Sequence, residues 1–112
     1  MRKTKVYNKL VRDLIPAVIE NNGSVPVVRI LKSDGEFLDS LQKKLKEEVR
    51  ELVSAQGRKE VVSETADIME VLHALLDFKN IPLSEVESAR KKKRKERGGF
   101  QDRIFLIKTR EK

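Results

Sequence analysis

The sequence predicts a mainly α-helical protein: an antiparallel helical bundle with a small β-ribbon formed by residues 25–31 and 103–109. Aliphatic residues recur every three or four positions over residues 36–79, which is the spacing of an apolar helix face. Hydrophobic residues make up 38% of the chain but aromatic residues only 4%, a composition that suits helix seams better than a β-sandwich. The chain has 112 residues, and we expect them to form one domain spanning residues 1–112.

The first part of the chain contains a short helix and a candidate strand. Pro16 suits the first turn of a helix over residues 16–21, where a backbone N–H is not needed. Residues 25–31 are rich in β-branched side chains and lie between turn-forming residues, a pattern typical of a strand. Pro26 restricts this strand to a sheet edge or to the strand's beginning.

Two long helices follow. Ser33 or Asp34 is expected to cap a helix over residues 36–55. Gly57 supplies a permissive backbone for the turn, and a second helix is expected over residues 59–79.

The sequence pattern of the last part of the chain predicts a third long helix and a second strand. Ser84 with Glu87 three residues later is a capping-box pattern, which indicates a helix over residues 84–96. The apolar run after it predicts a strand at residues 103–109, and we expect this strand to pair with residues 25–31.

Acidic residues interrupt the apolar seams of the two long helices. The seam residues are Leu38, Leu41, Leu45 and Leu52 in the first helix, and Val61, Ile68, Val71, Leu75 and Phe78 in the second. Glu48 takes a seam position in the first helix, and Glu64 takes one in the second. Each has an acidic neighbour three residues later, Glu51 and Asp67, on the same helix face. The helical hairpin is therefore expected to bring four carboxylates together.

Four carboxylates at a partly buried place need compensation, because an isolated buried charge is costly in free energy. Protonation, pairing with basic side chains or a bound cation would each supply it. One alternative is a solvated acidic face paired with Lys43, Lys44 and Lys46, which would contribute little to stability. Two acidic motifs in register on adjoining helices favour a bound cation instead. Oxygen ligands without Cys or His favour Mg²⁺, or Mn²⁺, over Zn²⁺.

The net charge of +7 comes mainly from one segment. Residues 90–97 contain seven basic residues and one acidic residue, so the rest of the chain is nearly neutral. The segment leads into Gly98 and Gly99, whose backbone can approach an anion closely. Together with the arginines and lysines of residues 90–97, this turn suits a polyphosphate. The alternative to phosphate binding is that the basic side chains of residues 90–97 stay hydrated and only complement the helix dipole.

A carboxylate metal cage together with a phosphate-binding segment indicates hydrolysis of a phosphoanhydride. Mg²⁺ held by carboxylates usually bridges substrate phosphates and can activate a water molecule. Glu47 or Glu51 is the candidate to accept the proton of that water. The alternative function is a small nucleic-acid-binding accessory protein that uses residues 90–97. The scarcity of aromatic residues and the lack of a recognition-helix motif argue against nucleic acid as the partner.

Three motifs together resemble a known group of enzymes. The EExxE motif of residues 47–51, followed by the ExxD motif of residues 64–67, is similar to the signature of the MazG-like all-α nucleoside triphosphate pyrophosphatases. Residues 7–13 (YNKLVRD) and 93–100 (KRKERGGF) resemble the small phosphoribosyl-ATP pyrophosphohydrolase-like branch of that superfamily. Leu14 departs from this branch, which often has lysine there. If the lysine of the other branch members contacts their substrate, the substrate specificity of this chain is expected to differ from theirs.

The resemblance implies hydrolysis of a nucleotide between its α and β phosphates, giving a monophosphate and pyrophosphate, with Mg²⁺ as cofactor. It leaves a histidine-pathway substrate and house-cleaning of non-standard nucleotides equally open, and it implies assembly as a homodimer or homotetramer. The implied metal ligands are Glu48, Glu51, Glu64 and Asp67, and the implied substrate contacts are Asn8, Lys9, Arg12, Lys93 and Arg97.

Other features of the sequence favour a cytoplasmic protein. The chain has no cysteine, and no run of about 18 apolar residues long enough to span a membrane. The basic N-terminus lacks the apolar segment of a secretory signal. We therefore expect neither disulfides nor a membrane span.

Overall fold

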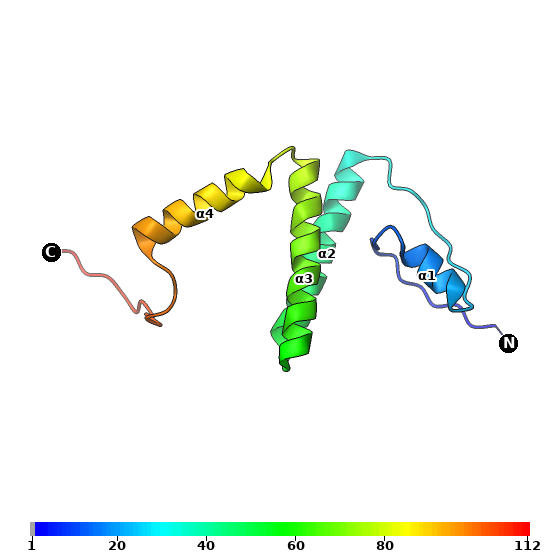
Figure 1. Ribbon diagram of the computed structural model, residues 1–112, viewed down its shortest axis with the longest axis horizontal. Coiled ribbons are helices and arrows are strands. Elements are labelled where there is room, and N and C mark those ends of the chain that lie inside the picture. Colours follow the sequence, from blue (N-terminus) through cyan, green and yellow to red (C-terminus); the bar gives the residue numbers. More distant parts are fainter. Residues whose placement is uncertain (1) are drawn as a thin grey trace. The chain divides into compact units, whose positions relative to one another are not determined.

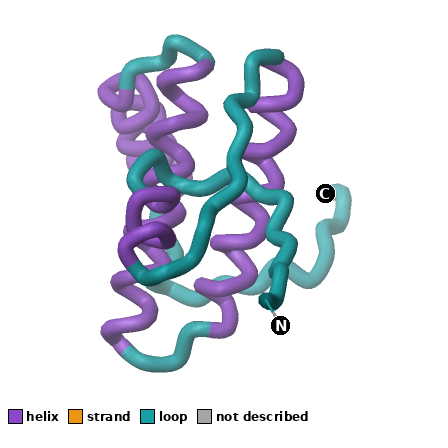
Figure 2. The backbone as a smooth tube through the Cα atoms, turned by 90° about the vertical axis from the view of Figure 1, so that its right-hand side faces the viewer, coloured by secondary structure: helices purple, strands orange, loops and turns teal. Residues whose placement is uncertain are grey.

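The regular structure of this protein is α-helical (Figures 1 and 2). The computed structural model describes residues 2–112. Its helices are α1 (Ile15–Asn21), α2 (Asp34–Ser54), α3 (Arg58–Phe78) and α4 (Leu83–Arg97). The first three belong to one unit, Met1–Asn80, and α4 belongs to another, Ile81–Lys112. The predicted helical class is confirmed, and each predicted helix is present with bounds close to the expected ones.

Helix α2 begins at a capping residue. Ser33 has an extended backbone, and its Oγ accepts a hydrogen bond from the Glu36 N–H at 3.4 Å. This bond satisfies one of the N–H groups that a helix leaves unpaired in its first turn. Asp34 and Glu36 place negative charge in the same turn, which complements the helix dipole. Of the two expected caps, Ser33 is the one used.

Helices α2 and α3 lie side by side as an antiparallel hairpin (Figure 1). Phe37 near the start of α2 and Phe78 at the end of α3 meet edge to face, with ring centroids 5.6 Å apart. The seam also contains Leu41, which is 3% exposed, and Val71, which is 9% exposed. No other apolar side chain within residues 2–112 is buried to this degree. The hairpin core is therefore thin.

Leu41→Ala is expected to destabilise the fold by about 2–4 kcal/mol, because it removes buried methyl groups and leaves a cavity in the seam. Urea unfolding followed by circular dichroism measures this free energy. Leu72→Ala on α3 is the matched control. Leu72 is 39% exposed, so its truncation is expected to cost within about 1 kcal/mol. Equal losses for the two variants would contradict the placement of the core.

The predicted β-ribbon is wrong. Neither residues 25–31 nor residues 103–109 form a strand, and no strand occurs in the part of the chain that the structure describes (Figure 2). Both segments are loops with exposed apolar side chains, such as Val27 and Phe105. A β-branched composition favours an extended backbone, but a strand also needs a neighbouring strand to pair its N–H and C=O groups. Composition does not supply that neighbour.

The predicted capping box of the last helix is also wrong. Helix α4 begins at Leu83, after Pro82, and no side chain caps it. Glu87 instead pairs with Arg90 one turn away, with an oxygen and a nitrogen 2.8 Å apart. Glu87 is thus engaged one turn further along the helix, so the local pattern does not decide the cap.

No helix within residues 2–112 combines the length and the apolar character needed to cross a membrane.

Candidate functional site

Three carboxylates from the two long helices converge on the hairpin. We call Glu48, Glu51 and Glu64 the carboxylate cluster. Glu48 and Glu51 lie one turn apart on α2, and Glu64 lies on α3. One oxygen of each residue lies within 4.8 Å of the corresponding oxygens of the other two. Glu48 is buried, Glu64 half-buried and Glu51 exposed, so the cluster extends from the helix interface to solvent.

Two oxygens of the carboxylate cluster are buried without a hydrogen-bond partner. They are Oε2 of Glu48 and Oε2 of Glu64, and neither has a donor among the described residues. Such an oxygen is costly in free energy, because its hydration is lost and not replaced. An oxygen-only set of ligands fits a hard divalent cation such as Mg²⁺ or Mn²⁺. The residues present therefore suit the metal that the sequence predicts.

Burial, followed by the crowding of negative charge, raises the pKa of Glu64. Desolvation, followed by interactions with Glu51, Glu48 and Asp67, raises the pKa of this carboxyl from 4.5 to about 7. Without a cation, Glu64 is therefore partly protonated near neutral pH. A divalent cation competes with this proton, because a carboxylate must be deprotonated to act as a metal ligand.

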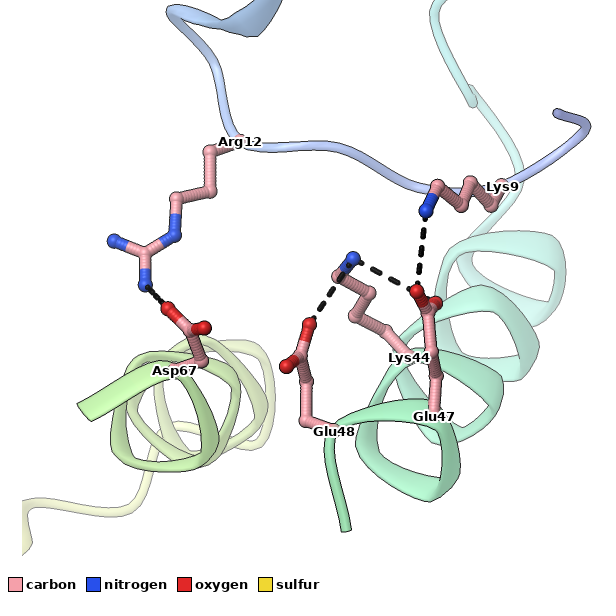
Figure 3. Close-up of polar contacts among 6 residues, drawn as sticks. All are labelled: Lys9, Arg12, Lys44, Glu47, Glu48 and Asp67. Carbon is pink, nitrogen blue, oxygen red and sulfur yellow. Dashed lines mark hydrogen bonds and ion pairs between the residues drawn. The ribbon is translucent and has the colours of Figure 1, made fainter. Parts of the chain in front are cut away.

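Lys44 partly compensates the carboxylate cluster (Figure 3). Its Nζ lies 3.2 Å from Oε1 of Glu48 and 3.6 Å from Oε2 of Glu47. The side chain of Lys44 is only 17% exposed, so this pair is better shielded from solvent than an ordinary surface pair. From the sequence alone, Lys44 is predicted only as a possible surface partner of the acidic residues. The four-residue spacing between Lys44 and Glu48 was the signal that could have identified it.

Asp67, the fourth predicted ligand, is paired with an arginine from the N-terminal segment (Figure 3). Nη2 of Arg12 lies 2.7 Å from Oδ1 of Asp67. Asp67 is not one of the three residues whose oxygens converge, although its charge contributes to the raised pKa of Glu64. The structure therefore brings three of the four predicted ligands together and places the fourth beside a cation.

Glu47 lies next to the carboxylate cluster and is bound by two lysines (Figure 3). Nζ of Lys9 lies 3.1 Å from its Oε1, and Lys44 approaches its Oε2. Desolvation by itself raises the pKa of Glu47, but hydrogen bonds and charge from Lys9 and Lys44 outweigh it and lower the pKa below its ordinary value. The hydrogen bond to Glu47 likewise raises the pKa of Lys9. Glu47 is therefore ionised and is a weak proton acceptor.

The N-terminal segment reaches both long helices. Lys9 contacts Glu47 on α2, and Arg12 contacts Asp67 on α3 (Figure 3). Asn8, just before them, has a φ of 46°, in the left-handed region that asparagine tolerates well. Lys9 and Arg12, two predicted substrate contacts, therefore lie against acidic side chains, and Asn8, a third, lines a hollow that Glu47 also lines.

Two hollows border this segment. A groove of about 420 Å³ lies between residues 7–10 and α2. A second hollow, of about 310 Å³, borders Arg12, Glu48 and Asp67. Both are in the size range of small-molecule sites.

The remaining predicted substrate contacts belong to the second unit. Lys93 and Arg97 lie on α4, and Gly98 follows the last helical residue with a φ of 82°, which favours glycine. Gly99 comes next in the chain. Contact of these four residues with a substrate stays a prediction.

Comparison with known proteins adds a family match. The sequence model described as phosphoribosyl-ATP pyrophosphohydrolase matches residues 28–94. This range includes the carboxylate cluster and Asp67 but not Asn8, Lys9 or Arg12. An uncharacterised protein of Mycolicibacterium smegmatis is 50% identical over 50 residues, which are 45% of this chain and 50% of that protein. The chain thus spans about half the length of this relative. No solved structure matches the chain.

Proposed function

We propose a nucleotide-hydrolysing function on the premise that this chain belongs to the phosphoribosyl-ATP pyrophosphohydrolase family, within the MazG-like all-α nucleoside triphosphate pyrophosphatase superfamily. The substrate is a nucleoside triphosphate or a related nucleotide, cleaved between its α and β phosphates to a monophosphate and pyrophosphate. House-cleaning of non-standard nucleotides is the proposed role. The observation that carries the proposal is the convergence of three carboxylates with two buried, unpartnered oxygens.

The proposed cofactor is Mg²⁺, with Mn²⁺ as a substitute. Glu48, Glu51 and Glu64 would hold it, since their oxygens already converge. Asp67 is the fourth proposed ligand, because Arg12 engages only its Oδ1. When bound, the ion neutralises phosphate charge and lowers the pKa of a coordinated water molecule.

The reaction transfers the nucleotidyl group, through its α-phosphorus, to water. The water oxygen bonds to the α-phosphorus, and the bond from that phosphorus to the bridging oxygen breaks. The bridging oxygen leaves with the pyrophosphate. One proton of the water passes to a carboxylate, Glu51 or Glu47, and then to solvent. Both stay candidates: Lys9 and Lys44 lower the pKa of Glu47, and Glu51 is also a proposed metal ligand.

The proposed substrate contacts come from both ends of the chain. Asn8, Lys9 and Arg12 lie beside the acidic side chains and offer an amide and two cations to phosphate oxygens. The second set consists of Lys93, Arg97, Gly98 and Gly99. These residues offer two cations and a backbone that can approach an anion closely.

We further propose that residues 1–112 act as one functional domain and assemble as a homodimer or homotetramer in the cytoplasm. The thin core supports assembly, because the hairpin buries few apolar side chains by itself. Exposed apolar residues such as Val27 and Phe105 are available to a second copy. The cysteine-free chain also suits a reducing compartment.

A nucleotide panel with identification of the products tests the proposed function. Standard and non-standard nucleoside triphosphates are incubated with the protein and Mg²⁺ or Mn²⁺, and phosphate and pyrophosphate are measured separately. At least one nucleotide is expected to give equal amounts of monophosphate and pyrophosphate. Single phosphate release would contradict the cleavage position. No turnover with any nucleotide, together with strongly salt-dependent binding of nucleic acid, would favour the alternative function of residues 90–97.

A further inference from the structure

We propose that the groove between residues 7–10 and α2 binds the β- and γ-phosphates of the nucleotide and, after cleavage, the pyrophosphate product. This inference rests on the proposed function and assigns one part of the substrate to one part of the site. The charged residues lining the groove are five cations, Lys9, Lys43, Lys44, Lys46 and Arg50, and a single carboxylate, Glu47. A hollow of about 420 Å³ with this excess of positive charge suits a polyanion.

Two cations of the groove have no acidic partner. Within the described residues, neither Lys46 nor Arg50 makes an ion pair. They lie four residues apart on one face of α2, and like charges at this spacing destabilise a helix. A bound diphosphate would relieve the repulsion. Lysine would supply a mobile point charge and arginine a planar pair of donors.

The ion pairs of the other charged residues in the groove do not prevent an anion from binding there. Lys43 pairs with Asp39 at 3.0 Å, but both side chains are mostly exposed, so the pair is weak and easily exchanged. Lys9 and Lys44 both bind Glu47 (Figure 3). Glu47, the one carboxylate among the described residues that line the groove, is therefore compensated and does not repel phosphate strongly.

Lys44 connects the groove to the carboxylate cluster. It lines the groove and also lines the hollow that borders Glu48. Its Nζ contacts both Glu47 and Glu48 (Figure 3). Under this proposal, a nucleotide whose α-phosphate lies at the carboxylate cluster places its β- and γ-phosphates past Lys44, in the groove. The groove would then lie on the leaving-group side of the bond that breaks.

Binding of inorganic pyrophosphate to the full chain tests this assignment. Isothermal titration calorimetry is performed at low salt, once with Mg²⁺ and once with a chelator. The double variant Lys46→Gln/Arg50→Gln is expected to raise the Kd of pyrophosphate at least about tenfold, because one lost charge-assisted hydrogen bond alone corresponds to about that factor. Both side chains are exposed, and their removal relieves repulsion, so the melting temperature is not expected to fall.

Two controls decide the interpretation. Arg58→Gln/Lys59→Gln removes the same two charges from the first turn of α3, outside the groove, and is expected to leave the Kd nearly unchanged. Equal weakening in this control would overturn the proposal, because only net charge would then matter. Loss of binding in Lys93→Gln/Arg97→Gln with normal binding in the groove variant would also overturn it.

The titration also separates this inference from the proposed function. Pyrophosphate binding that depends on the groove, in a protein that hydrolyses no nucleotide, would support the site and contradict the function. Nucleotide hydrolysis with unchanged pyrophosphate affinity in the groove variant would support the function and contradict the site.

Discussion

Replacing Glu64 with glutamine is expected to lower kcat for nucleotide hydrolysis by at least about a hundredfold, the scale on which loss of one preorganised electrostatic group acts. Glutamine keeps the shape of the side chain but removes the negative charge that would bind a cation. Glu48→Gln is expected to act in the same way, because its buried Oε2 belongs to the same cluster. Pyrophosphate release at saturating nucleotide and Mg²⁺ measures the change.

The matched control for these variants is Glu20→Gln. Glu20 is exposed on α1 and makes no ion pair within residues 2–112, so the same chemical change is expected to leave kcat unaltered. Circular dichroism checks that each variant keeps its helices. Normal activity in both Glu48→Gln and Glu64→Gln would contradict the metal site.

Mg²⁺ is expected to raise the melting temperature of the protein strongly. A ligand of the native state at a hundred times its Kd adds about 2.7 kcal/mol to the free energy of unfolding. For a domain of this size that corresponds to a shift of roughly 10 °C or more. Differential scanning calorimetry with Mg²⁺, Mn²⁺ or a chelator measures the effect. The same concentration of a monovalent salt is the control for ionic strength.

The ion-free protein is expected to lose stability as the pH rises toward neutrality. The pKa of Glu64 is about 7 in the folded protein, against an ordinary value of 4.5. A raised pKa means that the folded state holds the proton more tightly, so the stabilisation is complete below about pH 4.5 and is lost as the pH passes about 7. Groups with a lowered pKa, such as Glu47, are already ionised in this window and do not reverse the trend.

Mg²⁺ is expected to oppose this trend, because its binding displaces the proton and therefore strengthens as the pH rises through about 7. The stabilisation by Mg²⁺ thus grows with pH, and melting curves at several pH values measure it. Glu64→Gln is expected to flatten the pH dependence of the ion-free protein. An ion-free wild type whose stability rises from about pH 5 to pH 8 would contradict the shifted pKa.

The sequence by itself determined the helices and the candidate acidic residues. Helix boundaries depend on neighbouring residues: Ser33 caps α2 through the N–H of Glu36, three positions later. The spacing of apolar residues along a helix also depends only on nearby residues. This spacing correctly identified Glu48 as a charged residue at a buried position. Because Glu48 and Glu51 are one turn apart, their proximity also follows from the sequence.

Only the tertiary structure decided which charges meet. Arg12 and Asp67 are 55 positions apart, and Lys9 and Glu47 are 38 apart, so no helical period relates them. Pairing of residues 25–31 with residues 103–109 as strands would also depend on a partner far away in the sequence, and this prediction was wrong. The physical reason is common to both cases: local spacing shows where a side chain lies on its own element, whereas the partner of a charge or of a strand depends on how the elements pack.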